Sequence, residues 1–369
     1  MKIGLITFYK DNFGSILQAY ATYNWIEELG HKCEILDDEK KISKIERILK
    51  IPQYVFRSIY YKNYLKDKLL SKKKLNEAKN QLSLNTKKNM NEFIDNHFCI
   101  NKCEKYKNLN RQYDRFIVGS DQVWGIYTKF NFLVFADREK RIAFSPSFGS
   151  DSLKEYYKKD IKKALKGFDM LSTREESGVE IIKDLIGKEA ERLADPTLLF
   201  SRNDWEHFAS KGIHESNYIL LHFLDKPSDV SIKYINYYLK EHNCKVYSIC
   251  NKYNEWNQIN NCIFLDINPY DYVSLICNAN YVFTDSFHST LFSLNLETQF
   301  LTFERQYLFG DSQSSRIFDL LNRVSMLEKF VINDNDKINY DNEKNWNSDF
   351  LFYKERLNLK RYLESFVVI

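Results

Sequence analysis

The stretch richest in possible chemistry is residues 284–290, Thr-Asp-Ser-Phe-His-Ser-Thr. An apolar strand is predicted to end there and an apolar-striped helix to begin, because Asp285, Ser286 and Ser289 are favoured helix N-cap types. His288 would then lie beside the free N–H groups of a helix N-terminus, where it could bind a phosphate or carboxylate, or donate a proton. The alternative is a set of capping residues and a histidine that only packs.

A second predicted strand-to-helix junction spans residues 171–177, Leu-Ser-Thr-Arg-Glu-Glu-Ser. A serine or threonine followed three residues later by glutamate fits a capping box. Arg174 in this turn would project toward the crevice at the end of the strand, where its guanidinium group suits a phosphate or a carboxylate. The alternative is a solvated arginine on the surface.

Two further turns follow predicted strands in the first half of the chain. Gly119 lets the backbone approach a ligand closely, and Asp121 lies where a general base could meet a sugar hydroxyl. Residues 12–15, Asn-Phe-Gly-Ser, could bind a ligand through backbone N–H groups, but they lack the glycine spacing of a dinucleotide site. Purely structural turns are the alternative in both places.

Cysteine and histidine usage argues against a metal site and against secretion. His97, Cys99 and Cys103 are the only metal-like cluster in the sequence, and one histidine with two thiols does not complete a structural zinc site, so we expect no metal. Seven cysteines without dense spacing predict free thiols in a reducing compartment. The apolar run at residues 3–8 is too short for a signal peptide, and no stretch approaches the roughly 20 apolar residues of a membrane span. We therefore expect a cytoplasmic protein.

The length of 369 residues predicts two domains, and alternating strands and helices predict an α/β fold. The first domain is expected over residues 1–203, with strands near 3–8, 33–36, 115–118, 141–144 and 169–172, and helices near 15–29 and 177–186. The second is expected over residues 204–345, with strands near 218–223, 245–249, 263–265 and 281–284, and helices near 230–240, 270–278 and 289–296. Residues 346–369 are expected to form a C-terminal helix that packs back on the first domain. The carboxyl ends of the strands would line a cleft between the domains.

A basic segment interrupts the first domain. Residues 39–74 carry twelve lysines and arginines against three acids, interleaved with apolar and aromatic residues, within a helical insertion predicted at about 39–95. A solvated insertion is one interpretation, and a peripheral contact with an anionic membrane surface is another. We do not expect nucleic acid as a partner, because no recognisable binding motif accompanies the charge.

Seven stretches, taken in order, resemble the polysaccharide pyruvyl transferase family. They cover most of the chain from residue 3 to about residue 325. The matching pieces are residues 12–21 (NFGSILQAYA), 118–124 (VGSDQVW), 147–149 (SFG), 172–178 (STREESG), 195–199 (DPTLL), 284–288 (TDSFH) and 315–317 (SRI).

The resemblance implies a GT-B-like fold, in which two Rossmann-like domains face each other across the cleft that holds the active site. It implies a transferase that moves pyruvate from phosphoenolpyruvate to a sugar of a surface polysaccharide or its precursor, as a ketal. Phosphoenolpyruvate would be the co-substrate, with no further cofactor. The acceptor would be a sugar, a glycolipid or a nucleotide sugar.

The resemblance also places individual residues. His288 and Arg174 would lie at the donor, with His288 as the general acid, and Asp121 would orient or deprotonate an acceptor hydroxyl. Further donor contacts are expected from Ser286, Ser289 and Arg305. Acceptor contacts are expected from Asn12, Gly14, Gln18, Ser120 and Gln122.

The sequence departs from the family pattern at Ser289, where the family usually has glycine. Two other functions stay open. A GT-B glycosyltransferase would use the same histidine and arginine to grip the diphosphate of a sugar nucleotide, and thermal protection by a uridine-diphosphate sugar would favour it. A non-catalytic relative, kept open by Ser289, would bind ligand without turnover.

Overall fold

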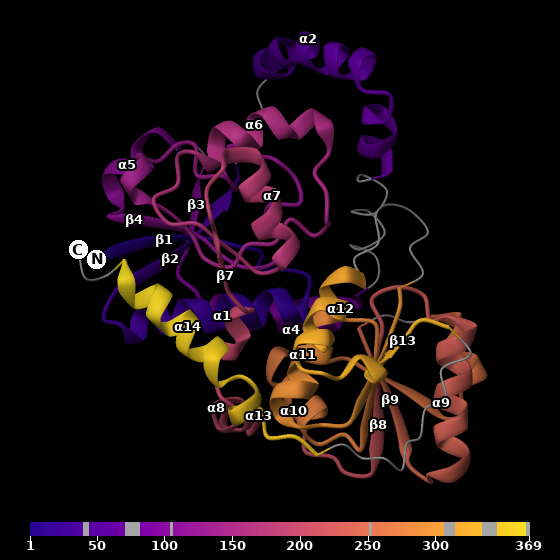
Figure 1. Ribbon diagram of the computed structural model, residues 1–369. Coiled ribbons are helices and arrows are strands. Elements are labelled where there is room, and N and C mark those ends of the chain that lie inside the picture. Colours follow the sequence, from indigo (N-terminus) through magenta and orange to yellow (C-terminus); the bar gives the residue numbers. More distant parts are fainter. Residues whose placement is uncertain are drawn as a thin grey trace.

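Two parallel α/β domains lie one above the other, with helices packed between them (Figure 1). The computed structural model describes residues 1–39, 44–70, 82–103, 106–250, 253–305, 314–333 and 345–366. Each sheet is made of short, buried strands. Parallel sheets covered on both faces need strands that are apolar throughout, and the strand from Tyr218 to His222 is buried at all five positions.

The first sheet has the strand order β3-β2-β1-β4-β5, and all its pairs are parallel. Its strands are β1 (Lys2–Ile6), β2 (Lys32–Asp38), β3 (Ile100–Cys103), β4 (Arg115–Val118) and β5 (Arg141–Ala143). The helices of this domain are α1 (Phe13–Glu28), α4 (Leu84–His97), α5 (Leu109–Gln112), α6 (Glu155–Leu165) and α7 (Glu176–Ile186). The strand expected at residues 169–172 is reduced to β6 (Ser172–Thr173), which pairs with β7 (Glu191–Arg192) outside the main sheet.

The second sheet has the order β10-β9-β8-β11-β12-β13 and is also parallel. Its strands are β8 (Tyr218–His222), β9 (Lys245–Ile249), β10 (Cys262–Leu265), β11 (Tyr281–Thr284), β12 (Phe300–Phe303) and β13 (Phe330–Val331). Its helices are α8 (Arg202–Ala209), α9 (Asp229–Glu241), α10 (Pro269–Cys277), α11 (Phe287–Leu296) and α12 (Ser314–Arg323). In both sheets the order reverses beside the first strand of the domain, and such switch points are where ligands bind in open α/β sheets.

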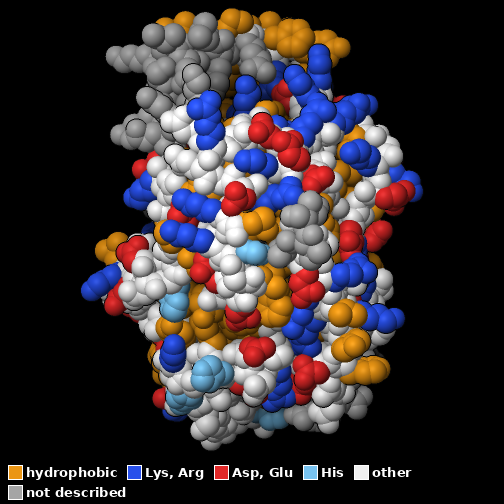
Figure 2. All heavy atoms as spheres, turned by 90° about the vertical axis from the view of Figure 1, so that its left-hand side faces the viewer, with side chains coloured by type: hydrophobic (Ala, Val, Ile, Leu, Met, Phe, Trp, Pro, Cys, Tyr) orange, Lys and Arg blue, Asp and Glu red, His pale blue; other side chains and the backbone are white. Residues whose placement is uncertain are grey.

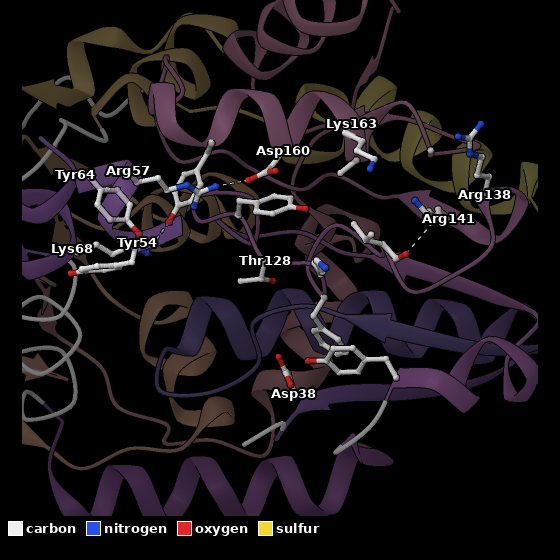
Figure 3. Close-up of a pocket in the computed structure, with 18 residues that line it drawn as sticks. Asp38, Tyr54, Arg57, Tyr64, Lys68, Thr128, Arg138, Arg141, Asp160 and Lys163 are labelled. Atoms are coloured by element: carbon white, nitrogen blue, oxygen red, sulfur yellow. Dashed lines mark hydrogen bonds and ion pairs between the residues drawn. The ribbon is translucent and has the colours of Figure 1, made fainter. Parts of the chain in front are cut away.

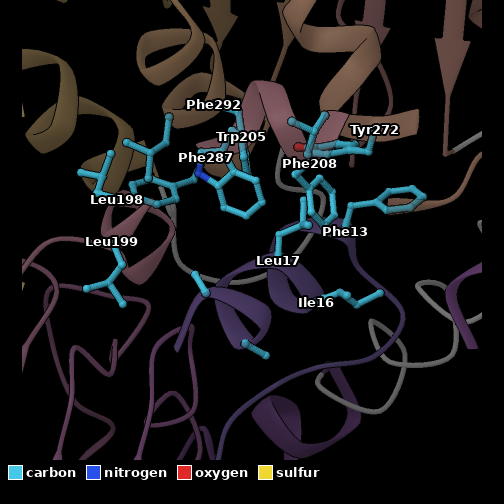
Figure 4. Close-up of a cluster of buried hydrophobic side chains, with 14 of the residues drawn as sticks. Phe13, Ile16, Leu17, Leu198, Leu199, Trp205, Phe208, Tyr272, Phe287 and Phe292 are labelled. Atoms are coloured by element: carbon cyan, nitrogen blue, oxygen red, sulfur yellow. The ribbon is translucent and has the colours of Figure 1, made fainter. Parts of the chain in front are cut away.

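A continuous apolar core joins the two domains (Figure 4). Phe13 of α1 stacks on Tyr272 of α10, with ring centroids 5.0 Å apart and an interplanar angle of 15°. Trp205 of α8 lies edge-on to Phe292 of α11 at 4.9 Å, and its indole nitrogen donates to the Thr197 carbonyl. Because this core crosses the domain boundary, it fixes α1 against α11 and so fixes the two switch points relative to each other.

The C-terminal helices return to the first domain. After α13 (Ser348–Leu351), α14 (Tyr353–Ser365) runs along the side of α1 (Figure 1). The Tyr362 hydroxyl donates to the Ala143 carbonyl at 2.8 Å, and Lys360 lies 4.5 Å from the Trp25 ring centroid. Helix α14 therefore packs against the first domain.

Helix α2 (Lys44–Tyr60) projects from the top of the first domain (Figure 1). Arg57 is ion-paired with Asp160 of α6 at 2.5 Å, which holds the second half of α2 to the body of the protein. Four of its apolar residues recur at helical spacing and are exposed: Ile48, Ile51, Val55 and Ile59. Hydrophobic side chains accordingly lie along the upper edge of the molecule in Figure 2. Within the described ranges, no helix is long and apolar enough to span a membrane.

Candidate active site

The two switch points face each other, and polar side chains gather where they meet. The first domain contributes the start of α1 and the turn after β4, and the second contributes the start of α11 after β11. Asn12 caps α1 by accepting from the Ser15 N–H at 3.1 Å, and Ser286 caps α11 by accepting from the Ser289 N–H. Two helix N-termini, each a favourable place for an anion, therefore converge on one site.

His288, in the first turn of α11, lies at the centre of this site and is 8% exposed. Its Nε2 atom lies 3.5 Å from Oδ2 of Asp195. This nitrogen has no hydrogen-bond partner among the described residues. Gly14 packs directly on the ring, since a Cβ atom at Gly14 would fall 2.2 Å from the His288 Cγ and Nδ1 atoms. The close approach of α1 to the histidine thus requires glycine at this position.

Asp195 accepts hydrogen bonds from several buried groups of the site. It accepts from Nη1 of Arg174 at 2.7 Å and from the Ser120 hydroxyl at 3.2 Å, while its other oxygen accepts from the Thr197 N–H. Burial alone would raise the pKa of Asp195, but His288, the Arg174 charge and the Thr197 N–H outweigh it and hold the pKa well below its usual range. Asp195 is therefore an ionised carboxylate facing the histidine.

Arg174 is buried within the protein, with only 1% of its surface exposed. Its Nε atom donates to Glu175 at 2.9 Å, and its guanidinium lies 4.5 Å from the centroid of the Phe287 ring. Burial would lower the pKa of Arg174, but Glu175, Asp195 and Asp121 raise it above its usual value. Its Nη2 atom is buried without a hydrogen-bond partner among the described residues, which leaves one donor for a ligand.

Asp121 lies in the turn after β4, where the charges of His288 and Arg174 act on it. Its Oδ2 accepts from the Ser15 hydroxyl at 2.5 Å and its Oδ1 from the Gln122 N–H at 2.8 Å. Its backbone is in the left-handed region, with φ of 67°, a conformation that aspartate tolerates better than most residues. Burial would raise the pKa of Asp121, but the nearby charges of His288 and Arg174 lower it, so the carboxylate is ionised.

A second buried arginine, Arg316 of α12, completes the cluster. Its guanidinium lies 5.8 Å from the Phe287 ring centroid, on which Arg174 also packs. Burial, followed by the Arg174 charge, lowers the pKa of Arg316 to about 10, so it is still a cation at neutral pH. The two guanidinium groups lie close to one phenylalanine ring, and Glu175 and Asp195 balance part of their charge. Guanidinium groups suit an anionic ligand.

Comparison with known families decides the identity of the chain. The family model described as polysaccharide pyruvyl transferase matches residues 12–307, which include every element of the site except α12. The chain belongs to the polysaccharide pyruvyl transferase family. No curated protein sequence is significantly similar to it.

Comparison with solved structures identifies the fold of this pyruvyl transferase family member. A Listeria monocytogenes protein described as a UDP-N-acetylglucosamine 2-epimerase is 8% identical, with a TM-score of 0.50 over 99% of this chain and 90% of the other. A Rickettsia bellii UDP-N-acetylglucosamine 2-epimerase (11% identity, TM-score 0.48, 100% and 96% covered) and Acinetobacter baumannii MurG (8%, 0.44, 100% and 93%) are also similar. The fold is GT-B-like, two Rossmann-like domains that face each other.

Ser289, the residue that departs from the glycine of the family pattern, places its hydroxyl inside the second domain. The Ser289 hydroxyl lies 2.5 Å from Nδ1 of His222 and 2.8 Å from the Tyr272 hydroxyl, inside the second domain. Burial, followed by the charges of Arg305 and His288, lowers the pKa of His222 to about 3, so this histidine is neutral. The serine therefore belongs to a buried hydrogen-bonded cluster behind α11.

The other residues expected at the donor and acceptor take different places. The Arg305 side chain donates to the Asp285 carbonyl at 2.9 Å, next to the start of α11. Gln18 is completely buried, and its amide nitrogen donates to Thr7 and to the carbonyls of Phe8 and Ser15. It supports the end of β1 from inside the protein.

Gln122 is more accessible and lines a pocket of about 460 Å³ in the first domain. Phe8 and Gly149 line the same pocket beside it. Asp121, the residue before Gln122 in the chain, does not line this pocket itself.

His97, Cys99 and Cys103 do not come together as a group of potential ligands in this structure. His97 contacts the Tyr270 hydroxyl at 2.7 Å and lies in a group of aromatic rings between α4 and α10. No group of three or more metal-ligating side chains occurs among the residues that the structure describes.

Sequence reasoning missed Asp195, Arg316 and Ser15 as site residues. Asp195-Pro196-Thr197 does carry a recognisable signal, because aspartate before proline is an N-cap pattern, and Asp195 caps the short 3₁₀ helix Pro196–Leu199. Ser315-Arg316-Ile317 matches the family pattern, but its position beside Arg174 depends on how α12 packs. Nothing local to the sequence reveals that contact.

Proposed function

We propose that this protein transfers pyruvate from phosphoenolpyruvate to two hydroxyls of one sugar in a surface polysaccharide or its precursor, forming a ketal. The observation that carries the proposal is His288 at the start of α11, with the ionised carboxylate of Asp195 3.5 Å from its Nε2 atom and two buried arginines beside Phe287. Asp121, in the turn after β4, is a second ionised carboxylate of the same site. A proton donor beside an anion-binding region is what this reaction requires.

The proposed reaction starts with protonation of phosphoenolpyruvate. A proton passes from His288 to the methylene carbon of phosphoenolpyruvate, which becomes a methyl group and leaves the neighbouring carbon electron-poor. One acceptor hydroxyl attacks that carbon, and the bond to the phosphate oxygen breaks. A second hydroxyl then closes the ketal, and the two hydroxyl protons restore the acid and protonate the phosphate. Asp121 orients the attacking hydroxyl or accepts its proton.

The donor would be held by the two buried arginines and the start of α11. Arg174 offers its Nη2 atom, Arg316 offers its charge, and the N-terminus of α11 offers backbone N–H groups for phosphate and carboxylate oxygens. The pocket that both arginines line with Phe287 has a volume of about 20 Å³, enough for one water molecule. Donor binding there therefore requires the lining side chains to move apart.

We also propose that α2 contacts an anionic membrane surface, which would bring the enzyme to a membrane-bound acceptor. Its exposed apolar residues form one face, with Ile48 62% and Ile59 80% exposed. Residues 39–74 carry a large excess of basic residues. An amphipathic helix with a basic surround is suited to the interface of anionic lipids.

Incubation with phosphoenolpyruvate and a panel of glycan acceptors in D₂O tests the transfer. The expected product is heavier than the acceptor by pyruvate less water, releases one phosphate, and carries one deuterium in its new methyl group. Deuterium in that methyl group reports protonation of the methylene carbon. If phosphoenolpyruvate is inert while a uridine-diphosphate sugar is consumed, the transfer proposed here is wrong.

A further inference from the structure

A large pocket in the first domain lies apart from the residues around His288 (Figure 3). It has a volume of about 970 Å³, at the upper end of the range for ligand sites. Its walls come from α2, the stretch 64–70, the loop 127–138 and α6. None of the side chains that contact His288 lines it.

The charge of this pocket is strongly positive. Two carboxylates, Asp38 and Asp160, face six cations: Arg57, Lys68, Lys129, Arg138, Arg141 and Lys163. Three of these cations already have an ion-pair or hydrogen-bond partner. Arg57 pairs with Asp160, Lys68 donates to the Tyr157 hydroxyl at 3.0 Å, and Arg141 donates to backbone carbonyls of the 134–136 turn.

The other three cations stand at the rim. Lys129, Arg138 and Lys163 are exposed, and none of them forms an ion pair with another described residue. Figure 3 shows Arg138 and Lys163 on the same side of the pocket, beside Arg141. Such a group of uncompensated charges at the mouth of a cavity attracts anionic ligands.

The remaining wall is aromatic. Five tyrosines line the pocket: Tyr54, Tyr64, Tyr106, Tyr127 and Tyr157. Two pairs of these rings contact each other: Tyr54 and Tyr64 lie edge-on at 5.3 Å, and Tyr127 and Tyr157 lie tilted at 6.3 Å. Tyrosine presents a rigid apolar face with a polar tip, which suits a ligand that has apolar faces and many hydroxyls, such as a chain of sugar rings.

This pocket adjoins the smaller pocket that Gln122 lines. The 460 Å³ pocket lined by Gln122 shares Lys68, Thr128 and Tyr157 with the basic pocket. Gln122 directly follows Asp121, whose carboxylate lies beside His288. The two pockets therefore adjoin each other, and the smaller one lies next to the turn that carries Asp121.

We propose that the basic, tyrosine-lined pocket binds a distal, negatively charged part of an extended glycan. Its sugar rings pack on the tyrosines, and its anionic groups pair with Lys129, Arg138 and Lys163. The link to catalysis rests on the proposed function, because the proximal sugar of the same glycan would be the acceptor near Asp121. The binding itself does not depend on pyruvyl transfer. A single-stranded oligonucleotide, which also combines stacking with charge, is the competing ligand.

Direct titration of the full chain without phosphoenolpyruvate tests the proposal. The probes are a hexamer of galacturonic acid, neutral maltohexaose and a hexathymidylate. We expect the galacturonate hexamer to bind about tenfold more tightly than maltohexaose, and its affinity to fall as salt is added.

The double substitution Arg138→Gln and Lys163→Gln should weaken the galacturonate hexamer about fivefold to twentyfold, as loss of two charge contacts predicts. The matched control, Lys162→Gln and Lys166→Gln, removes two exposed lysines at the same end of α6 that do not line the pocket, and it should bind like the wild type.

Three results would overturn the proposal: equal affinity for the charged and neutral hexamers, equal loss in both double variants, or tightest binding by the hexathymidylate. A protein that ignores phosphoenolpyruvate yet shows the expected pattern would refute the proposed function and leave the pocket assignment intact. A protein that turns over phosphoenolpyruvate without this binding pattern would refute the pocket assignment and leave the proposed function intact.

Discussion

At the scale of single residues, the contact between Gly14 and His288 links the two domains at the point where chemistry is proposed. A methyl group at Gly14 would meet ring atoms of His288 at 2.2 Å, so Gly14→Ala must displace the histidine. A misplacement near 1 Å can cost about a hundredfold in rate, and we expect turnover to fall by about that factor. Steady-state kinetics below the melting temperature of the variant measures it.

The control for that substitution is Gly4→Ala. Its added methyl would meet Leu36 at 2.7 Å in the first sheet, so it strains the core of the same domain without touching the histidine. It should lower the melting temperature and keep the wild-type rate. Equal rate losses in the two variants would mean that Gly14 acts through general stability.

Asp195→Asn tests whether the ionised carboxylate holds the cluster together. The variant leaves Arg174 with one buried partner fewer, and breaking such a pair costs about 3–5 kcal/mol at pH 7. The folded-state pKa of Asp195 is depressed, so its contribution is fully present above the ordinary aspartate pKa of about 4 and is lost as pH falls below it. The stability gap between wild type and variant should therefore stay constant from pH 7 to 5 and narrow below pH 4.

Urea unfolding across that pH range measures the gap. Asp349→Asn is the matched control, because Asp349 also binds an arginine, Arg356, but is itself 70% exposed. Its loss should cost at most about 1 kcal/mol. A gap at Asp195 that persists unchanged to pH 2 would show that its charge does not stabilise the fold.

At the scale of elements, α2 carries the proposed membrane contact. Ile51→Glu with Ile59→Glu should place two acids on its exposed apolar face and abolish co-flotation with anionic liposomes at low salt. The control, Tyr353→Glu with Leu357→Glu, changes two exposed residues on α14 and should leave flotation as in the wild type. Failure of the wild-type protein to float at low salt would end the membrane proposal.

Much of the order of strands and helices can be predicted from local sequence. Buried parallel strands appear as short apolar runs, and helices begin at recognisable capping residues. The helix expected at residues 15–29 is α1, with its cap at Asn12. The strand Phe300–Phe303 was not predicted, since a four-residue apolar run directly after a helix has no period that identifies it. The strand expected at 169–172 fails because the chain leaves the main sheet after one bridge, from Ile142 to Met170.

The candidate site was predictable only where its residues follow strands. His288 and Asp121 lie at strand ends, where the α/β pattern itself points to a site. Asp195 follows β7, and the pairing of β7 with β6 brings it to Arg174. Arg316 lies in α12, which packs on α11 and so brings the arginine to Phe287. No local spacing encodes either contact.

At the scale of the whole molecule, the shared core predicts that the two domains unfold together. Domains usually move independently unless their interface is large and hydrophobic, and this interface includes the stack of Phe13 on Tyr272 and the buried Trp205. Scanning calorimetry should show one transition for the full chain. Two separate transitions would mean that the apolar core does not couple the domains.

The most direct test of the central claim is the turnover of His288→Asn with phosphoenolpyruvate and an acceptor that the wild type uses. Asparagine keeps a polar group at the start of α11 but cannot donate a proton as an acid. We expect normal folding, retained phosphoenolpyruvate binding, and phosphate release about 10²–10⁴-fold slower than in the wild type. Phosphate release at the wild-type rate would contradict the assignment of His288 as the general acid.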